Sequence, residues 1–333
     1  MLSKTILALG ASLVAFAAAA QQPIEMKLAT ATINDANHAW LNEYKTRIEQ
    51  RTNGRIKAQV YPAGQLGDIS RVVEGLQLGT IEFSNIPPAF LLGLNPAFQI
   101  AEAPGVFESP EHARKVFTDP AFREKFTRAA VDKGVLGASV WINGQTAYAT
   151  HKPFRGIDDL KGQKIGVRAS KVEADVVAAL GATGVPITFT EVLPALQNKV
   201  IDGYRGSLPV MFGRQFQTVT KTATLLDDTI IPVMGWVSVA WLDKLPADLR
   251  QTVLDTAREM DDWGSANGAR FEQRSAKLWT DAGGEVITLS KADRDEIVRR
   301  ASAVSTQNLS NHQHPQTREM FGLMRALAAK HKG

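Results

Sequence analysis

Few side chains in this sequence could do chemistry, and they do not form a catalytic set. The motifs G-x-S-x-G, H-E-x-x-H and G-x-G-x-x-G and the P-loop are all missing from the sequence. Of the six histidines, only His312 and His314 are close in sequence, and no third metal ligand stands beside them. Acidic pairs such as Asp227-Asp228 are expected in turns or on helix surfaces, where solvation would explain them. The sequence therefore predicts a protein that is not an enzyme and holds no metal and no cofactor.

Length and composition favour a large, exported, soluble protein. A chain of 333 residues with 44% hydrophobic and 22% charged residues can build two lobes, each with its own core. Without cysteine it has neither disulfides nor thiol chemistry. Basic residues are scattered, so no nucleic-acid surface is expected. Lys4 and the following apolar, alanine-ended run predict a signal peptide over residues 1–20 and a periplasmic location.

The elements that must position a site begin with two strand–helix repeats. Strands are expected at 24–31, 56–60 and 81–83, with a helix over 39–52. A second helix begins after Asp68, because Ile69, Val72, Val73 and Leu76 share one face, and it ends at Gly79. Such alternation predicts a parallel sheet.

The rest of the chain continues this alternation. Further helices are expected at 110–118, 120–133, 171–180, 291–309 and 315–330, and a helix capped by Thr190 after the strand 186–188. Other strands are expected at 135–142, 164–168, 235–242 and 285–289. One long helix over 246–282 would extend along both lobes.

Several short blocks carry a resemblance to a known family. They are 52–56, 60–68, 75–80, 158–165, 180–182, 190–192, 195–197 and 201–203. In this order they resemble the solute-binding proteins of tripartite ATP-independent periplasmic (TRAP) transporters, the DctP-type family. The resemblance implies a two-lobed α/β fold with an inter-lobe cleft, crossing hinge strands and a long helix that spans both lobes. The expected division is lobe I over 21–143, lobe II over 144–231, and a crossing strand with helices packed on both lobes over 232–333.

The resemblance also implies that the cleft holds a small organic acid through an arginine, since a guanidinium offers two parallel donors to a carboxylate. Here the sequence departs from the family, because Gly166 and Thr146 occupy the two usual arginine positions. Arg168 lies two residues beyond Gly166 and would share its strand face. The alternative interpretation is that the Arg168 side chain faces the solvent. Arg205, where the family has an acid, is a second candidate, with a surface ion pair as its alternative.

Other candidate ligand contacts follow from the same resemblance. Phe189 matches a cleft-lining aromatic, and Asn85 and Thr32 lie where the first lobe contributes contacts. Trp141, Trp236 and Tyr204 could wall the ligand or belong to the core.

The implied function is capture of a small organic acid and its delivery to the integral membrane permease of a TRAP transporter, by a monomer. Two alternatives stay open. The protein could serve an ATP-driven permease or a membrane sensor, or it could be a periplasmic enzyme on the same fold.

Overall fold

A computed structural model describes residues 22–168 and 170–332. The predicted signal peptide, residues 1–20, lies outside the described residues. None of the helices described is both long and apolar enough to cross a bilayer.

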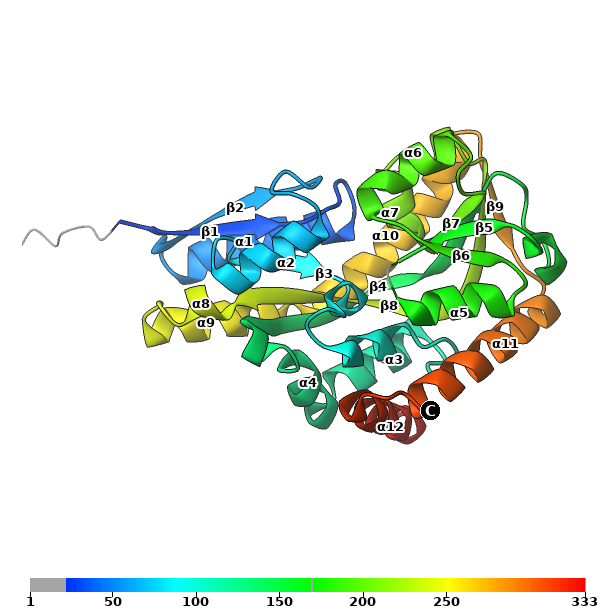
Figure 1. The fold of residues 1–333 in the computed structure, drawn as a ribbon. Helices are drawn as coiled ribbons and strands as arrows, with labels where there is room; N and C mark the ends of the chain where they lie inside the picture. Colours follow the sequence, from blue (N-terminus) through cyan, green and yellow to red (C-terminus); the bar gives the residue numbers. More distant parts are fainter. Residues whose placement is uncertain (1–21, 169, 333) are drawn as a thin grey trace, which may run out of the picture.

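The described residues form two α/β lobes that share one nine-stranded sheet (Figure 1). The strand order is β2-β1-β3-β8-β4-β7-β5-β6, with β9 paired to β8. The short strands are β1 (Ile24–Ala29), β2 (Ile56–Tyr61), β3 (Phe83–Ile86), β5 (Lys164–Val167), β6 (Thr183–Pro186), β7 (Gly203–Ser207) and β9 (Glu285–Thr288). The pairs β1–β2, β1–β3, β5–β6 and β5–β7 are parallel, as the alternation of strands and helices predicts.

Two long antiparallel strands cross from one lobe to the other. They are β4 (Val135–Thr150) and β8 (Thr222–Ser238). One end of β8 pairs with β3 in the first lobe, while the far half of β4 pairs with β7 in the second. The expected boundary at 143/144 falls inside β4, where the register with β8 shifts between Ile142 and Gly144.

Helices cover both faces of this sheet. In the first lobe and below it lie α1 (Ala36–Arg51), α2 (Ile69–Leu78), α3 (Pro110–Thr118) and α4 (Pro120–Thr127). The second lobe carries α5 (Lys171–Ala179), α6 (Val192–Gln197) and α7 (Leu208–Gly213), and α11 (Lys291–Ser310) leads from it to α12 (Pro315–Lys330). Short 3-10 turns include η1 (Pro88–Leu91), η2 (Pro96–Glu102), η3 (Val131–Lys133), η4 (Ile157–Leu160), η5 (Phe189–Glu191) and η6 (Phe216–Thr218).

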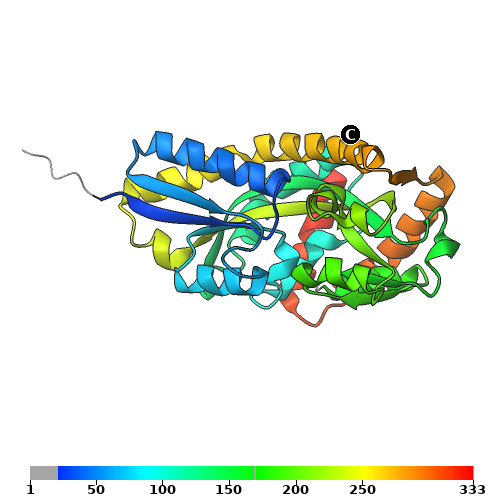
Figure 2. The ribbon, with the colours of Figure 1, turned by 90° about the horizontal axis from the view of Figure 1, so that it is seen from above.

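The prediction of a single helix over 246–282 is wrong, because the structure has two helices there. α9 (Ala247–Glu259) ends at Met260, and α10 (Asp261–Asp281) begins at the next residue. The Asp261 carboxylate pairs with Arg123 and accepts the backbone N–H of Val140 at 2.9 Å, which fixes the start of α10 on the crossing strand. Figure 2 shows the two helices along one side of the molecule, next to α1.

Other boundaries also differ from the expectation. The apolar run over 235–242 is the end of β8 followed by a short helix, α8 (Val239–Leu242), which Ser238 caps. β6 precedes the expected strand at 186–188, and β3 begins where the expected strand at 81–83 ends. Thr190 lies within η5 and caps no helix, since α6 starts only at Val192. α2 agrees with the prediction: the Asp68 side chain accepts the N–H of Arg71, and Gly79 ends the helix with φ +74°.

Candidate functional site: a small cavity between the lobes

A cavity of about 60 Å³ lies where the two lobes and the crossing strands meet. This volume holds roughly four to six water-sized positions. The first lobe contributes Thr30, Ala31, Thr32, Asn37, Ile69, Asn85, Ile86, Pro87 and Phe90. The second contributes Arg168, Phe189, Tyr204, Gly206, Ser207 and Val210, and the crossing strands contribute Asn143 and Ile231.

A wider pocket of about 260 Å³ adjoins this cavity. Ala31, Ile69, Phe90 and Phe189 line both spaces, so they separate the inner cavity from the outer pocket. The outer pocket also includes Asp68 at the start of α2. A ligand that enters through this pocket passes an apolar constriction before it reaches the inner cavity.

Arg168 lines the inner cavity and is 5% exposed. It follows the last residue of β5, and its Nε donates to Oε1 of Glu102, at the end of η2, at 2.5 Å. Its Nη2 lies 2.9 Å from Oε1 of Glu173, which belongs to α5. Burial alone lowers the pKa of Arg168, but the carboxylates of Glu173 and Glu102 outweigh this effect and hold the pKa above its usual value. The guanidinium therefore stays charged at every pH at which the protein is folded.

Arg205 lies next to this cluster but not at the cavity. It is 0% exposed on β7, and its guanidinium pairs with Glu173 and, at 2.7 Å, with Asp228. It also donates to the Thr229 hydroxyl at 2.8 Å. Arg205 therefore does not line this cavity, because its charge is used inside the second lobe.

Glu173 joins the two arginines. Both guanidinium groups contact its Oε1, from Arg168 at 2.9 Å and from Arg205. Burial raises the pKa of Glu173, although the two arginines act in the opposite direction. Its position within the first turn of α5, capped by Ser170, explains how a helix supplies an acid to the end of a neighbouring strand.

Side-chain amides supply most of the other polar atoms of the cavity. Asn85 is 4% exposed, and neither its Oδ1 nor its Nδ2 has a hydrogen-bond partner among the described residues. The same holds in this part of the chain for Oδ1 of Asn143 and Oδ1 of Asn37. The Nδ2 of Asn143 donates to the Ser207 hydroxyl at 3.2 Å. Because a buried amide without a partner costs free energy, these atoms are suited to hydrogen bonds with a ligand.

Tyr204 lines the cavity in a space that two glycines leave open. A Cβ on Gly206 would lie 2.6 Å from Cε1 of Tyr204, and a Cβ on Gly166 would lie 3.1 Å from its Cδ2. The ring therefore covers the strand position at which the resemblance places an arginine. Phe189 and Phe216 flank the ring, with centroid distances of 6.4 and 5.6 Å.

The remaining expected site residues divide into two groups. Phe189 and Thr32 line the cavity, and the Thr32 hydroxyl lies 3.1 Å from that of Thr30. Trp141 and Trp236 do not line it. Trp141 packs in the first-lobe core against α10, and the Trp236 indole donates to the carbonyl of Ile86 at 2.9 Å. The structure thus places both tryptophans in the packed core, the second of the two interpretations that the sequence left open.

Sequence reasoning missed Asn143, Ser207 and Glu102. Asn143 was expected only to end a strand, and Ser207 carried no signal beyond its position after Gly206. Glu102 lies 66 residues before Arg168, so no local pattern could reveal their pairing.

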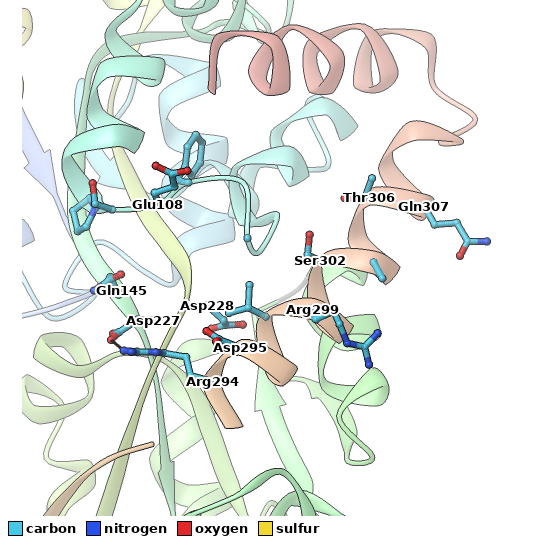
Figure 3. A pocket seen from close by; sticks show the side chains of 16 residues that line it. Glu108, Gln145, Asp227, Asp228, Arg294, Asp295, Arg299, Ser302, Thr306 and Gln307 are labelled. Atoms are coloured by element: carbon cyan, nitrogen blue, oxygen red, sulfur yellow. Dashed lines mark ion pairs between the residues drawn. The ribbon is translucent and has the colours of Figure 1, made fainter. Parts of the chain in front are cut away.

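A larger groove of about 1010 Å³ lies elsewhere, between α11 and the loop before α3 (Figure 3). Charged side chains in this groove lie close to one another: Nη1 of Arg294 is 3.6 Å from Oδ2 of Asp227. Asp228 reaches this groove from the buried cluster. The groove is open and has mixed charge, whereas the inner cavity is buried.

Two α/β lobes, two crossing strands and a buried cavity at their junction define a protein that encloses a small solute. The family "Bacterial extracellular solute-binding protein, family 7" (DctP) matches residues 29–311. The chain belongs to this family, so the predicted family and fold class are confirmed. Membership implies a periplasmic location.

Relatives and solved structures agree with this assignment. The chain is 29% identical over 293 residues to a solute-binding protein of Verminephrobacter eiseniae, covering 87% of this chain and 86% of the relative. It is 28% identical over 252 residues to the C4-dicarboxylate-binding periplasmic protein DctP of Vibrio cholerae, with 76% of each chain covered.

The fold is similar to that of a TRAP periplasmic solute-binding protein from Desulfovibrio salexigens with bound orotic acid. The TM-score is 0.87 at 24% identity, over 92% of this chain and 99% of the other. A sugar-acid-binding protein from Advenella mimigardefordensis in complex with galactonate gives a TM-score of 0.87 at 21% identity, over 93% and 99% of the two chains.

Proposed function

We propose that this protein captures a small organic acid in the periplasm and delivers it to the membrane permease of a TRAP transporter, without chemical change. The observation that carries the proposal is Arg168. Among the described residues that line the cavity, its side chain alone carries a formal charge. The acids named for related proteins, including C4-dicarboxylates and galactonate, support an acid as the ligand.

In this proposal the ligand carboxylate contacts the Arg168 guanidinium, and Asn85 and Asn143 hydrogen-bond to the rest of the ligand. Phe189 and Tyr204 form the apolar walls, and Thr32 completes the polar side. A carboxylate buried in this cavity is stable only with such a partner. Contacts to both lobes stabilise the closed arrangement when the ligand is present.

The partner and the export route belong to the same proposal. The signal peptide over residues 1–20 directs export, and the mature protein acts as a monomer. If the genes beside this one encode a pair of integral membrane subunits and no ATPase, that would support a TRAP permease. An adjacent ATPase gene would instead favour an ATP-driven permease.

The direct test is ligand binding by isothermal titration calorimetry, after a thermal-shift screen of organic acids. Replacing Arg168 alone would leave the buried Glu102 without its cationic partner, whereas Glu173 would keep Arg205, so the test variant is Arg168→Met with Glu102→Gln. Losing a buried charged partner costs about 2–5 kcal/mol of binding energy, which predicts at least roughly 30-fold weaker binding.

Arg123→Met with Asp261→Asn is the matched control. That pair is also a buried ion pair, at the start of α10, and it does not line the cavity. The control should keep the affinity of the wild type. Equal affinity of the Arg168 variant and the wild type would refute the proposed role of Arg168.

A further inference from the structure

The part of the chain that the structure describes places one cation at the cavity, and that cation already has two acidic neighbours. Arg168 is the one charged side chain among the described residues lining the cavity, and its guanidinium contacts Glu102 and Glu173. Within the described ranges 22–168 and 170–332, neither lysine nor histidine contributes to this lining. A ligand carboxylate therefore has one guanidinium to contact, and a second carboxylate on the same ligand has none.

The neighbouring buried charges add no positive surplus. The second arginine, Arg205, contacts Glu173 and Asp228. The cluster thus places two guanidinium groups among three carboxyl groups, Glu102, Glu173 and Asp228. An anion with two charges would enter a site whose cations are already balanced, and its second charge would lose its hydration without compensation.

The rest of the lining suits an uncharged ligand body. Its amide oxygens and the two hydrogens of the Asn85 amide can bond to hydroxyl, carbonyl or amide groups. Its carbon surface is supplied by Ile69, Ile86, Pro87, Phe90, Phe189, Val210 and Ile231. Asp68 in the outer pocket adds a carboxylate near the mouth, which opposes a second negative charge there.

We propose that this cavity takes a small acid with one carboxylate and an uncharged, largely apolar body, and that it discriminates against dicarboxylates. This inference rests on the proposed function, because it requires that a ligand carboxylate contacts Arg168. It differs from the ligand that the name of the Vibrio cholerae relative states, a C4-dicarboxylate.

The experiment compares acids that differ by one carboxylate on a matched skeleton. The mature protein is titrated with butyrate and succinate, with benzoate and phthalate, and with the neutral amides butyramide and benzamide. Thermal shift at about 10 mM ligand detects even millimolar affinities, since binding to the native state raises stability by mass action. Calorimetry then gives the dissociation constants.

We expect at least one monocarboxylate to bind, and its dicarboxylate partner to bind at least about 100-fold more weakly. A dicarboxylate that binds as tightly as its monocarboxylate partner overturns this inference and leaves the proposed function standing. Binding of an amide as tightly as of its acid overturns the role of Arg168, and no stabilisation by any acid overturns capture of a small acid altogether.

One substitution tests whether the preference for monocarboxylates depends on the number of cations at the cavity or on the protein acids that pair with Arg168. Glu102→Gln removes one acidic neighbour from Arg168 without adding a cation, so monocarboxylates should bind about tenfold more tightly while dicarboxylates remain the weaker ligands. Glu82→Gln is the control, since Glu82 is a buried glutamate that accepts the backbone N–H of Lys27 away from the cavity. Equal binding of both acid classes by the Glu102 variant would contradict the single-cation argument.

Discussion

The contact between Tyr204 and Gly206 makes a sharp prediction about the shape of the cavity. In Gly206→Ala the new Cβ would lie 2.6 Å from Cε1 and 3.3 Å from Cδ1 of the tyrosine ring. Both residues belong to β7, whose backbone is paired with β4 and cannot retreat easily. The ring must therefore move.

The direction of this movement decides the effect on binding. Phe216 packs on the ring edge-on at 5.6 Å, so one side of the ring is occupied by the second-lobe core. The cavity offers the free side. A ring that shifts into a space of about 60 Å³ removes at least one water-sized position, roughly a sixth to a quarter of the room.

Two magnitudes follow from this geometry. Overpacking of this kind costs roughly 1–3 kcal/mol of unfolding free energy. Acid affinity should fall by at least about tenfold, which corresponds to roughly 1.4 kcal/mol. Urea denaturation measures the first quantity, and calorimetry with the acid identified by the thermal-shift screen measures the second.

Two further variants make the test specific. Adding Tyr204→Leu to Gly206→Ala removes the ring and should restore most of the stability. Gly322→Ala is the control, because Gly322 lies within α12 and, apart from the backbone of that helix and the two neighbouring residues, no atom of the described residues comes within 4 Å of the place that its new methyl group would take. This change should stabilise the protein by about 0.5–1 kcal/mol. Wild-type stability and affinity in Gly206→Ala would refute the reasoning.

Three other predictions concern the parts that surround the cavity. Arg205→Met should cost about 3–5 kcal/mol in urea denaturation, because it removes the cationic partner of the buried Asp228, while calorimetry on the folded protein should find that the ligand still binds. Burial raises the pKa of Glu272 to about 7 from 4.5, so its effect on stability is most favourable below pH 4.5 and is lost as pH rises through 7. In the wild type this effect lowers the free energy of unfolding by about 3 kcal/mol between pH 5 and pH 8. Urea denaturation of Glu272→Gln at the two pH values should not show this decrease. Gly268→Ala would place Cβ against the Ile142 carbonyl oxygen, well inside van der Waals distance, and we expect urea denaturation to show a loss of at least about 1–3 kcal/mol because this backbone belongs to a crossing strand.

Local signals predicted several helix starts well, since they depend on residues close in sequence, although the helix expected over 120–133 ends at Thr127. Asp68 and Ser290 cap α2 and α11 through their side chains, and α12 begins at Pro315, as expected. The prediction of a single helix over 246–282 failed because the break depends on residues that are distant in sequence. No glycine or proline marks Met260, and the break depends on the contact of Asp261 with Arg123, far away in sequence.

The crossing strand β4 shows a different source of error. Asn143-Gly144 has the composition of a turn, and a strand ending at Ile142 was expected there. The structure instead continues the strand through a register shift, with Gly144 at φ +144°. Glycine permits both outcomes, and pairing with β8 decides between them.

Candidate site residues could be predicted only as far as the family pattern places them near the cleft. Arg168 and Arg205 are both buried arginines of the second lobe, and their sequence contexts do not separate their roles. The difference comes from distant partners: Asp228 and Thr229 occupy Arg205, while Arg168 reaches the cavity. Trp141 and Trp236 likewise differ from Phe189 only in the direction in which the backbone presents their side chains.

The acids beside Arg168 explain how a guanidinium can occupy a buried cavity at all. An uncompensated cation there would cost several kcal/mol, and a free arginine side chain would lose about 2 kcal/mol of rotamer entropy on binding. Glu102 and Glu173 remove both costs, since they balance the charge and hold the side chain in place. The same acids weaken the attraction for the ligand, so affinity reflects how much better the ligand carboxylate suits Arg168 than Glu102 does. Affinity at this site is therefore set by a protein acid as much as by the arginine, and sequence changes at Glu102 should alter affinity without altering the fold.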